Sequence, residues 1–122
     1  MKAIGFRAEK DAINWAVVEG KKESPVLVAD GRIAAPQIGD EADSLSYFRQ
    51  RVLAIIQLHR PAIAMVRYPE TFGRRNRAIA SMDSRLRVEG VILESVRSTA
   101  TPVISGALKT ISSRIGSDEP KA

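Results

Sequence analysis

The chain has 122 residues, 44% of them hydrophobic, and a formal net charge of +5 from 19 lysines and arginines against 14 acids. This length and composition predict one globular domain that buries roughly 65% of its unfolded surface, without the roughly 20 consecutive apolar residues of a membrane span. The absence of cysteine excludes disulfides and thiolate zinc sites, and His59, the single histidine, leaves little for a histidine-based metal site or a catalytic triad.

The first third of the chain predicts three strands. Residues 2–6, 12–18 and 25–29 are apolar runs separated by polar or glycine-containing stretches. The dipeptide Asp30-Gly31 is a turn signal, and we expect it to close the third strand. Three strands within so short a stretch indicate an antiparallel meander.

A helix is predicted next, from the acidic and capping residues around Asp40 to the breaker Pro61. Leu45, Phe48, Val52, Ile55 and Leu58 recur at helical spacing between these limits. His59 falls in the last turn, where a cation complements the helix dipole, and we assign it this capping role rather than a catalytic one.

The second half of the chain predicts a strand at residues 62–66, a basic loop, a helix at 77–97, a strand at 101–105 and a short helix at 106–115. The expected core face of the long helix carries Ile79, Met82, Leu86, Gly90 and Leu93. The order β-β-β-α-β-α-β-α predicts an α/β domain with a mixed five-stranded sheet and helices on its faces. We expect one domain over residues 1–116 and a flexible tail over 117–122.

With this element order, three stretches resemble the ribonuclease H-like fold in its RuvC-type branch, the Holliday-junction resolvases. They are MKAIGFRAEKDAINWAVVEG, HRPAIAMVRYPETF and VEGVILESVRSTATPVISGALKTISSRIG. The resemblance implies a nuclease whose acidic residues hold two divalent cations. In that family the acids end the first strand, end the strand after the first helix, and lie on a C-terminal helix.

Here the corresponding positions do not carry those acids. The first falls at Phe6 or Arg7, the second at Arg67 or Tyr68, and beyond residue 116 only Asp118 and Glu119 remain. A guanidinium has no lone pair to offer a metal ion, so an arginine cannot ligate magnesium. We therefore interpret the chain as a catalytically inactive relative that needs no metal or other cofactor.

A basic surface and arginine at the strand ends predict an anion site for DNA, RNA or a protein that processes them. Its expected residues are Arg7, Arg67, Tyr68, Arg74, Arg75 and Arg77. Trp15 lies within an alternating strand, so we expect it to pack on the sheet instead of stacking on a base.

Three alternatives stay open. Arg67 could form a structural ion pair with Glu9, Asp11 or Glu70, or these acids could serve a divergent metal-dependent nuclease. The domain could also be a protein-interaction scaffold without a nucleic-acid role.

Other expectations concern the long helix and the location of the protein. Val88, Val91 and Val96 lie off its expected core face and suit a homodimer through this helix. Asp83, Glu89 and Glu94 are interpreted as surface charges. The opening residues lack the apolar core of a secretory signal, so we expect a cytoplasmic protein without a membrane partner.

Overall fold

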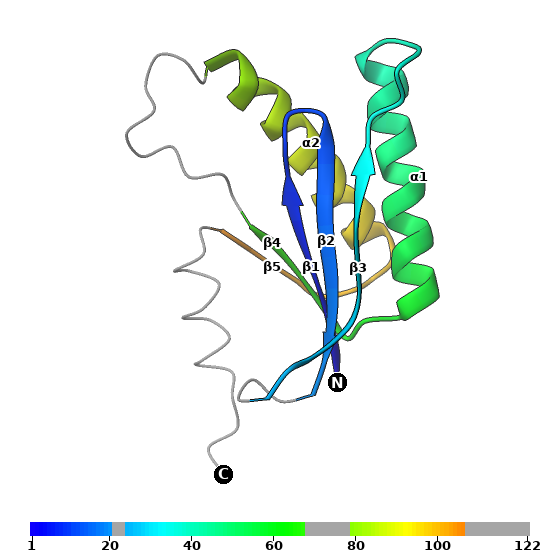
Figure 1. Ribbon diagram of the computed structural model, residues 1–122, viewed down its shortest axis with the longest axis vertical. Coiled ribbons are helices and arrows are strands. Elements are labelled where there is room, and N and C mark those ends of the chain that lie inside the picture. The colour runs from blue at the N-terminus through cyan, green and yellow to red at the C-terminus, as the bar shows by residue number, and fades with distance from the viewer. Residues whose placement is uncertain (21–23, 68–78, 107–122) are drawn as a thin grey trace.

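The computed structural model of the chain describes residues 1–20, 24–67 and 79–106, drawn in colour in Figure 1. The elements are β1 (Lys2–Ala8), β2 (Ala12–Glu19), β3 (Val26–Ala34), α1 (Glu41–His59), β4 (Ile63–Arg67), α2 (Ile79–Ser98) and β5 (Val103–Gly106). The predicted order is confirmed as far as the fifth strand. The expected last helix and tail lie outside the described residues, apart from Gly106, which ends β5.

The strands form one mixed sheet in the order β3-β2-β1-β4-β5. β1, β2 and β3 are antiparallel neighbours, as short hairpin connections allow. β4 is parallel to β1 and β5 is parallel to β4, and a helix crosses over before each of these strands, as parallel pairing requires. β1 is therefore the central strand, at which pairing changes from antiparallel to parallel (Figure 1).

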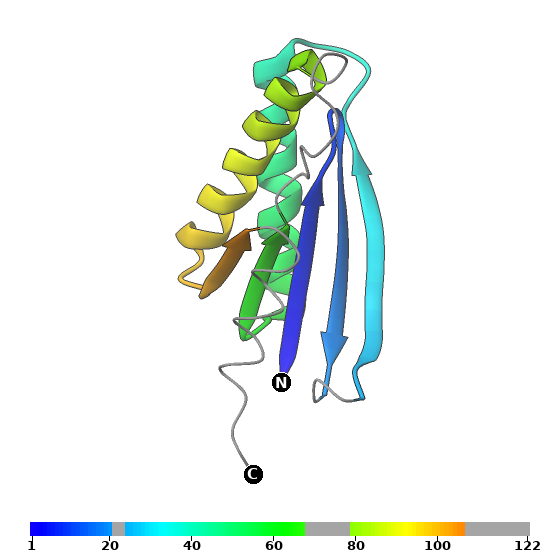
Figure 2. The ribbon, with the colours of Figure 1, turned by 90° about the vertical axis from the view of Figure 1, so that its left-hand side faces the viewer.

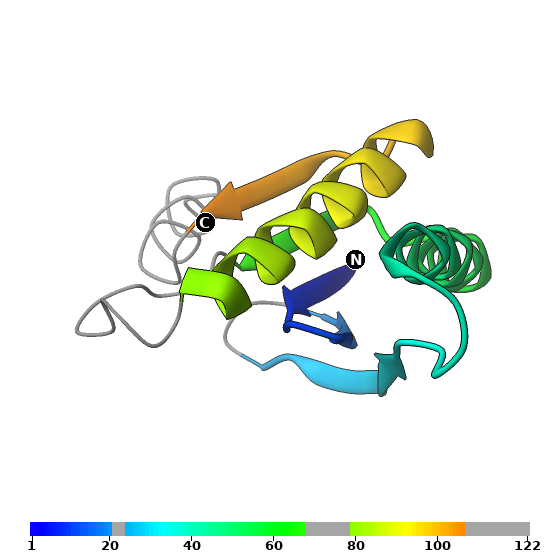
Figure 3. The same ribbon diagram turned by 90° about the horizontal axis from the view of Figure 1, so that it is seen from above.

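Both described helices pack on one face of the sheet, as Figures 2 and 3 show. Successive strand residues point to opposite faces, so Ile4 and Phe6 of β1 are buried under the helices whereas Arg7 points to the other face. The helices contribute Phe48, Val52, Ile55, Ile56, Val88, Ile92 and Val96 to the core. The same alternation decides which side chains of each strand can reach a ligand.

Helix α1 begins and ends at the predicted signals. The Asp43 N–H donates to Asp40 Oδ1 at 3.0 Å, and the Asp40 N–H donates to Asp43 Oδ2 at 3.1 Å, which forms a reciprocal capping box. This bond from Asp43 lowers the pKa of Asp40. At the other end Arg60 adopts a left-handed conformation with φ 48° and donates its N–H to the Ile56 carbonyl at 2.7 Å.

The prediction of a turn at Asp30-Gly31 is wrong. Strand β3 continues through both residues to Ala34, and Gly31 is the register partner of Trp15 on β2. The Trp15 ring lies so close to Gly31 that a methyl group there would be 3.0 Å from three ring atoms. Because Gly31 has no side chain, the indole of Trp15 can occupy the space beside it. Trp15 packs on the sheet as predicted.

The predicted core face of α2 is wrong in part, since Leu93 packs against the core as predicted but other residues do not follow the prediction. Val88 and Val96, expected on the surface as dimer contacts, are buried in the core, and Val91 packs against it. Leu86, expected in the core, is 50% exposed. The sequence offers two apolar stripes, and packing against α1 and the sheet selects the one that contains Val88, Ile92 and Val96 over the one that contains Gly90.

Two exposed ion pairs between the helices are consistent with this rotation. Arg87 on α2 contacts Glu41 on α1 at 2.8 Å, and Arg49 on α1 contacts Glu94 on α2 at 2.9 Å. Residues 87 and 94 therefore face α1, and the stripe next to them faces the sheet. Neither described helix is long and apolar enough to cross a membrane.

Candidate functional site

Arg7 and Arg67 lie side by side near the carboxyl ends of two parallel strands. They are register partners in the pairing of β1 with β4, where Phe6 is paired with Val66 one residue earlier. Since Phe6 and Val66 are buried under the helices, Arg7 and Arg67 point to the opposite face. The resemblance to resolvases implied one metal-binding position at Phe6 or Arg7 and another at Arg67 or Tyr68, and the structure pairs Arg7 with Arg67.

The same row continues across the antiparallel half of the sheet. Arg7 is paired with Asn14 on β2, and Asn14 is paired with Arg32 on β3. We call Arg32, Asn14, Arg7 and Arg67 the arginine row. Neighbouring strands lie roughly 4.8 Å apart, so the row spans roughly 14 Å on one face of the sheet. Arg7 and Arg32 are exposed, whereas Asn14 and Arg67 are half-buried.

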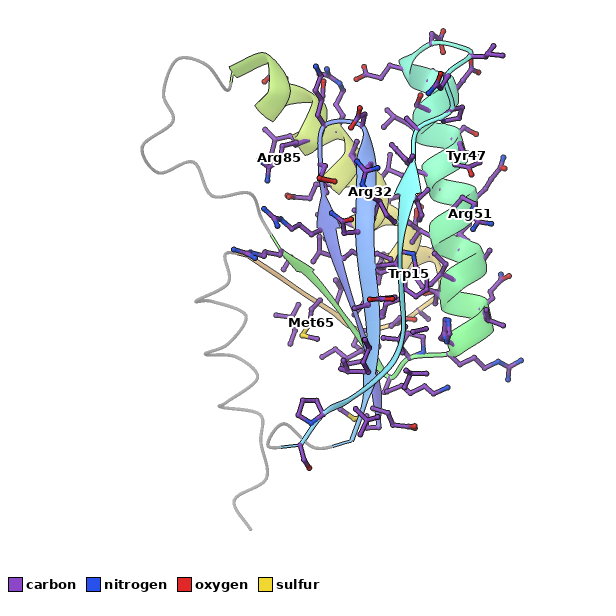
Figure 4. The ribbon with its side chains drawn as sticks, in the orientation of Figure 1. Trp15, Arg32, Tyr47, Arg51, Met65 and Arg85 are labelled. Atoms are coloured by element: carbon purple, nitrogen blue, oxygen red, sulfur yellow. The ribbon has the colours of Figure 1, made fainter. Side chains whose placement is uncertain are left out.

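Arg32 was missed as a candidate because the sequence signal at Asp30-Gly31 put it beyond a turn. Figure 4 shows it on the upper part of the sheet. Its Nε lies 3.3 Å from Glu9 Oε1, and both side chains are substantially exposed. An exposed pair of this kind contributes about 0 to 1 kcal/mol, so Glu9 can leave Arg32 to a ligand at small cost.

The arginine row does not fit the divalent cations that the fold family implies. Arg7 and Arg67 cannot donate a lone pair to a metal ion, and two guanidinium groups repel one. Among the described residues, no cluster of three or more histidines, cysteines or acids could hold a metal. Of the acids considered for a divergent metal site, Glu9 is bonded to Arg32, Asp11 is exposed, and Glu70 lies outside the described residues.

The other expected site residues belong to the segment between β4 and α2. Tyr68, Arg74, Arg75 and Arg77 fall in residues 68–78, outside the described part of the chain. Their role therefore stays a prediction. Arg67 ends β4, so in sequence the segment follows directly on the arginine row.

Glu89 is a buried acid that the sequence did not reveal. It was expected on the surface with Asp83 and Glu94, but it is 5% exposed, while Asp83 and Glu94 are exposed. Its Oε2 and the Nε of Arg85, one turn earlier on α2, are both buried without a hydrogen-bond partner. Burial raises the pKa of Glu89, and the positive charge of Arg85 opposes this rise.

A cavity of about 300 Å³ lies at the opposite end of the sheet from the arginine row. Its lining consists of Ile56, Gln57, Arg60, Pro61, Thr99 and Thr101. Pro61 precedes β4, whereas Arg67 ends it, so the cavity and the row are separated by the length of that strand. The hydroxyl groups of Thr99 and Thr101 form a hydrogen bond with each other at 2.8 Å. They are therefore less available to bind a ligand in this cavity.

The strand order β3-β2-β1-β4-β5, with helices crossing over before β4 and β5, defines a ribonuclease H-like α/β domain. Solved structures of RuvC-type resolvases share this fold. Thermus thermophilus RuvC in complex with a Holliday junction substrate is similar with a TM-score of 0.72 and 18% identity, over 87% of this chain and 64% of that one.

Two further resolvase structures share the fold of this chain. Another Thermus thermophilus RuvC structure gives a TM-score of 0.68 at 21% identity, again over 87% of this chain and 64% of that chain. The yeast mitochondrial Holliday junction resolvase Ydc2 gives 0.61 at 8% identity, over 91% of this chain and 54% of its own. The chain thus spans less than two thirds of the length of these resolvases. No protein-family model matches the sequence, and no curated protein matches it significantly.

Proposed function

We propose that this domain is a catalytically inactive RuvC-type relative that binds nucleic acid through the arginine row. The observation that carries the proposal is the register pairing of Arg7 with Arg67 at the carboxyl ends of β1 and β4. Two permanent positive charges stand where the resemblance implies metal-binding acids. These arginines can bind a phosphate group directly through charge-assisted hydrogen bonds. A metal-dependent nuclease would instead bind the phosphate through a divalent cation.

Charge and comparison support the same ligand class. The net charge of +5 favours a polyanion, because binding phosphates releases the counterions condensed on them. Thermus thermophilus RuvC is known in complex with a Holliday junction substrate, so a branched DNA is the first ligand to test. A row of guanidinium groups also suits single strands, since it contacts the backbone without reading base edges.

The test is a binding titration of labelled four-way junction, duplex and single-stranded DNA between 50 and 200 mM salt. Wild-type affinity should fall steeply with salt, and Arg7→Ala should reduce the slope of log affinity against log salt by about one for each lost phosphate contact. The matched control is Arg51→Ala, which removes the same charge from an exposed position on α1, away from the sheet (Figure 4).

The outcomes separate the three classes of function. Weak binding that Arg7→Ala and Arg51→Ala reduce equally would contradict the proposal and favour a scaffold whose charge serves solubility. Magnesium-dependent cleavage of the junction that Glu9→Ala abolishes would instead identify a divergent nuclease. Selective binding of the four-way junction that Arg7→Ala weakens and Arg51→Ala does not would support the proposal and identify branched DNA as the ligand.

A further inference from the structure

Strand β3 forms one edge of the sheet, and several of its apolar side chains are exposed to solvent. Among the described strands it is bonded only to β2. Val26, Leu27 and Val28 are 64%, 58% and 42% exposed. An edge strand of nine residues with consecutive exposed apolar side chains is a template for pairing with another strand.

The hydrogen bonds to β2 show which backbone groups of β3 point outward. Ala35 donates its N–H to the Asp11 carbonyl at 2.9 Å, in the register that pairs Ala34 with Ala12. In an antiparallel pair, residues bonded to the neighbour alternate with residues whose backbone groups point away from it. Asp30, Arg32 and Ala34 therefore present their N–H and C=O groups to the outer edge.

This edge is complementary to itself. In a two-fold antiparallel pairing centred on Gly31, Asp30 of one copy lies opposite Arg32 of the other, and both are residues with outward backbone groups. Val28, which has no register partner on β2 because the register shifts there, then lies opposite Ala34. Shifting the centre to the neighbouring symmetric registers puts Asp30 opposite Asp30, or Arg32 opposite Arg32. Only the Gly31 register pairs the charges favourably.

We propose that β3 docks against β3 of a second copy of this chain, centred on Gly31, to form one continuous sheet. The inference is independent of nucleic-acid binding. It uses a surface different from the homodimer expected through α2, which stays a prediction although two of the three valines assigned to that contact are buried in the core. A two-fold axis perpendicular to the sheet leaves the helices of both copies on one face and both arginine rows on the other.

Charge reversal tests the register. Asp30→Arg or Arg32→Asp alone puts like charges opposite each other twice, and should raise the dimer dissociation constant at least about tenfold. The double variant Asp30→Arg with Arg32→Asp restores opposite charges and should recover the dimer. Sedimentation equilibrium measures the change between 13.3 kDa and twice that mass. Matched controls are Asp83→Arg on α2 and Arg51→Asp on α1, both exposed.

Amide hydrogen exchange gives a second, independent readout. Gly31 and Ile33 are bonded to β2 and should be protected at every concentration, whereas Asp30 and Arg32 should gain protection only as the protein dimerises. A wild-type chain that stays monomeric at high concentration would overturn the proposal. So would a dimer that the single reversals weaken no more than the controls do, since that result requires another surface.

Discussion

The indole of Trp15 on β2 lies directly against the Cα of Gly31 on β3. A methyl group added at residue 31 would lie 3.0 Å from Cε2, Cζ2 and Nε1 of that ring. The same ring contacts His59 in the last turn of α1, with centroids 5.8 Å apart. Trp15 thus links the edge of the sheet to a helix end, and Gly31 leaves the room for it.

Gly31→Ala should therefore destabilise the protein, although alanine normally suits a strand better than glycine. The added methyl group displaces a packed ring, and overpacking of this kind costs about 1 to 3 kcal/mol. Urea denaturation measures the loss. Gly5→Ala on β1 is the control, because nothing lies within 4 Å of its added methyl group, so its stability should be unchanged or slightly increased. Equal effects of the two variants would contradict the packing role of Gly31.

Helix α2 offers a test of which face it buries. Val96→Ala removes two methyl groups from a fully buried position and should cost about 1 to 3 kcal/mol of unfolding free energy. Leu86→Ala, on the face that the sequence pattern favoured, should change stability by less than about 0.5 kcal/mol because Leu86 is half exposed. The reverse ranking in denaturation would mean that the helix is rotated.

Glu89 should make stability depend on pH. Burial raises its pKa in the folded protein, so its contribution is most favourable when it is protonated. That contribution is present below the ordinary glutamate pKa of about 4.3 and is lost as pH rises through the higher folded value. Glu89→Gln should remove this dependence, and so gain stability relative to wild type between acidic and neutral pH. If the difference in unfolding free energy between the two proteins were the same at all pH values, the predicted role of Glu89 would be contradicted.

The register pairing of Arg7 and Arg67 predicts how the protein responds to metal. Calorimetric titration of the wild-type domain with manganese should show no micromolar binding, because guanidinium groups supply no ligand. The double variant Arg7→Asp with Arg67→Glu puts two carboxylates on neighbouring strands and should gain weak manganese binding. Micromolar binding by the wild type would overturn the proposed replacement of metal by arginine.

Much of the fold follows from local patterns. Strand periodicity located β1, β2 and β4, and capping residues such as Asp40 located the start of α1. The resemblance of three stretches to resolvases indicated a ribonuclease H-like mixed five-stranded sheet, which the structure confirms. The resemblance also made Arg7 and Arg67 candidates for an anion site. Only the structure showed that they are register partners on neighbouring strands.

The sequence by itself determined the element order and the positive charge at the ends of β1 and β4, because periods, caps and residue types are local properties. Only the tertiary structure decided that β3 runs through Asp30-Gly31, that Arg32 joins the row, and that Glu89 is buried. These depend on residues far away in the chain. The Trp15 ring lies against Gly31, where a larger side chain would meet it, and packing against α1 and the sheet selects one of two apolar stripes on α2.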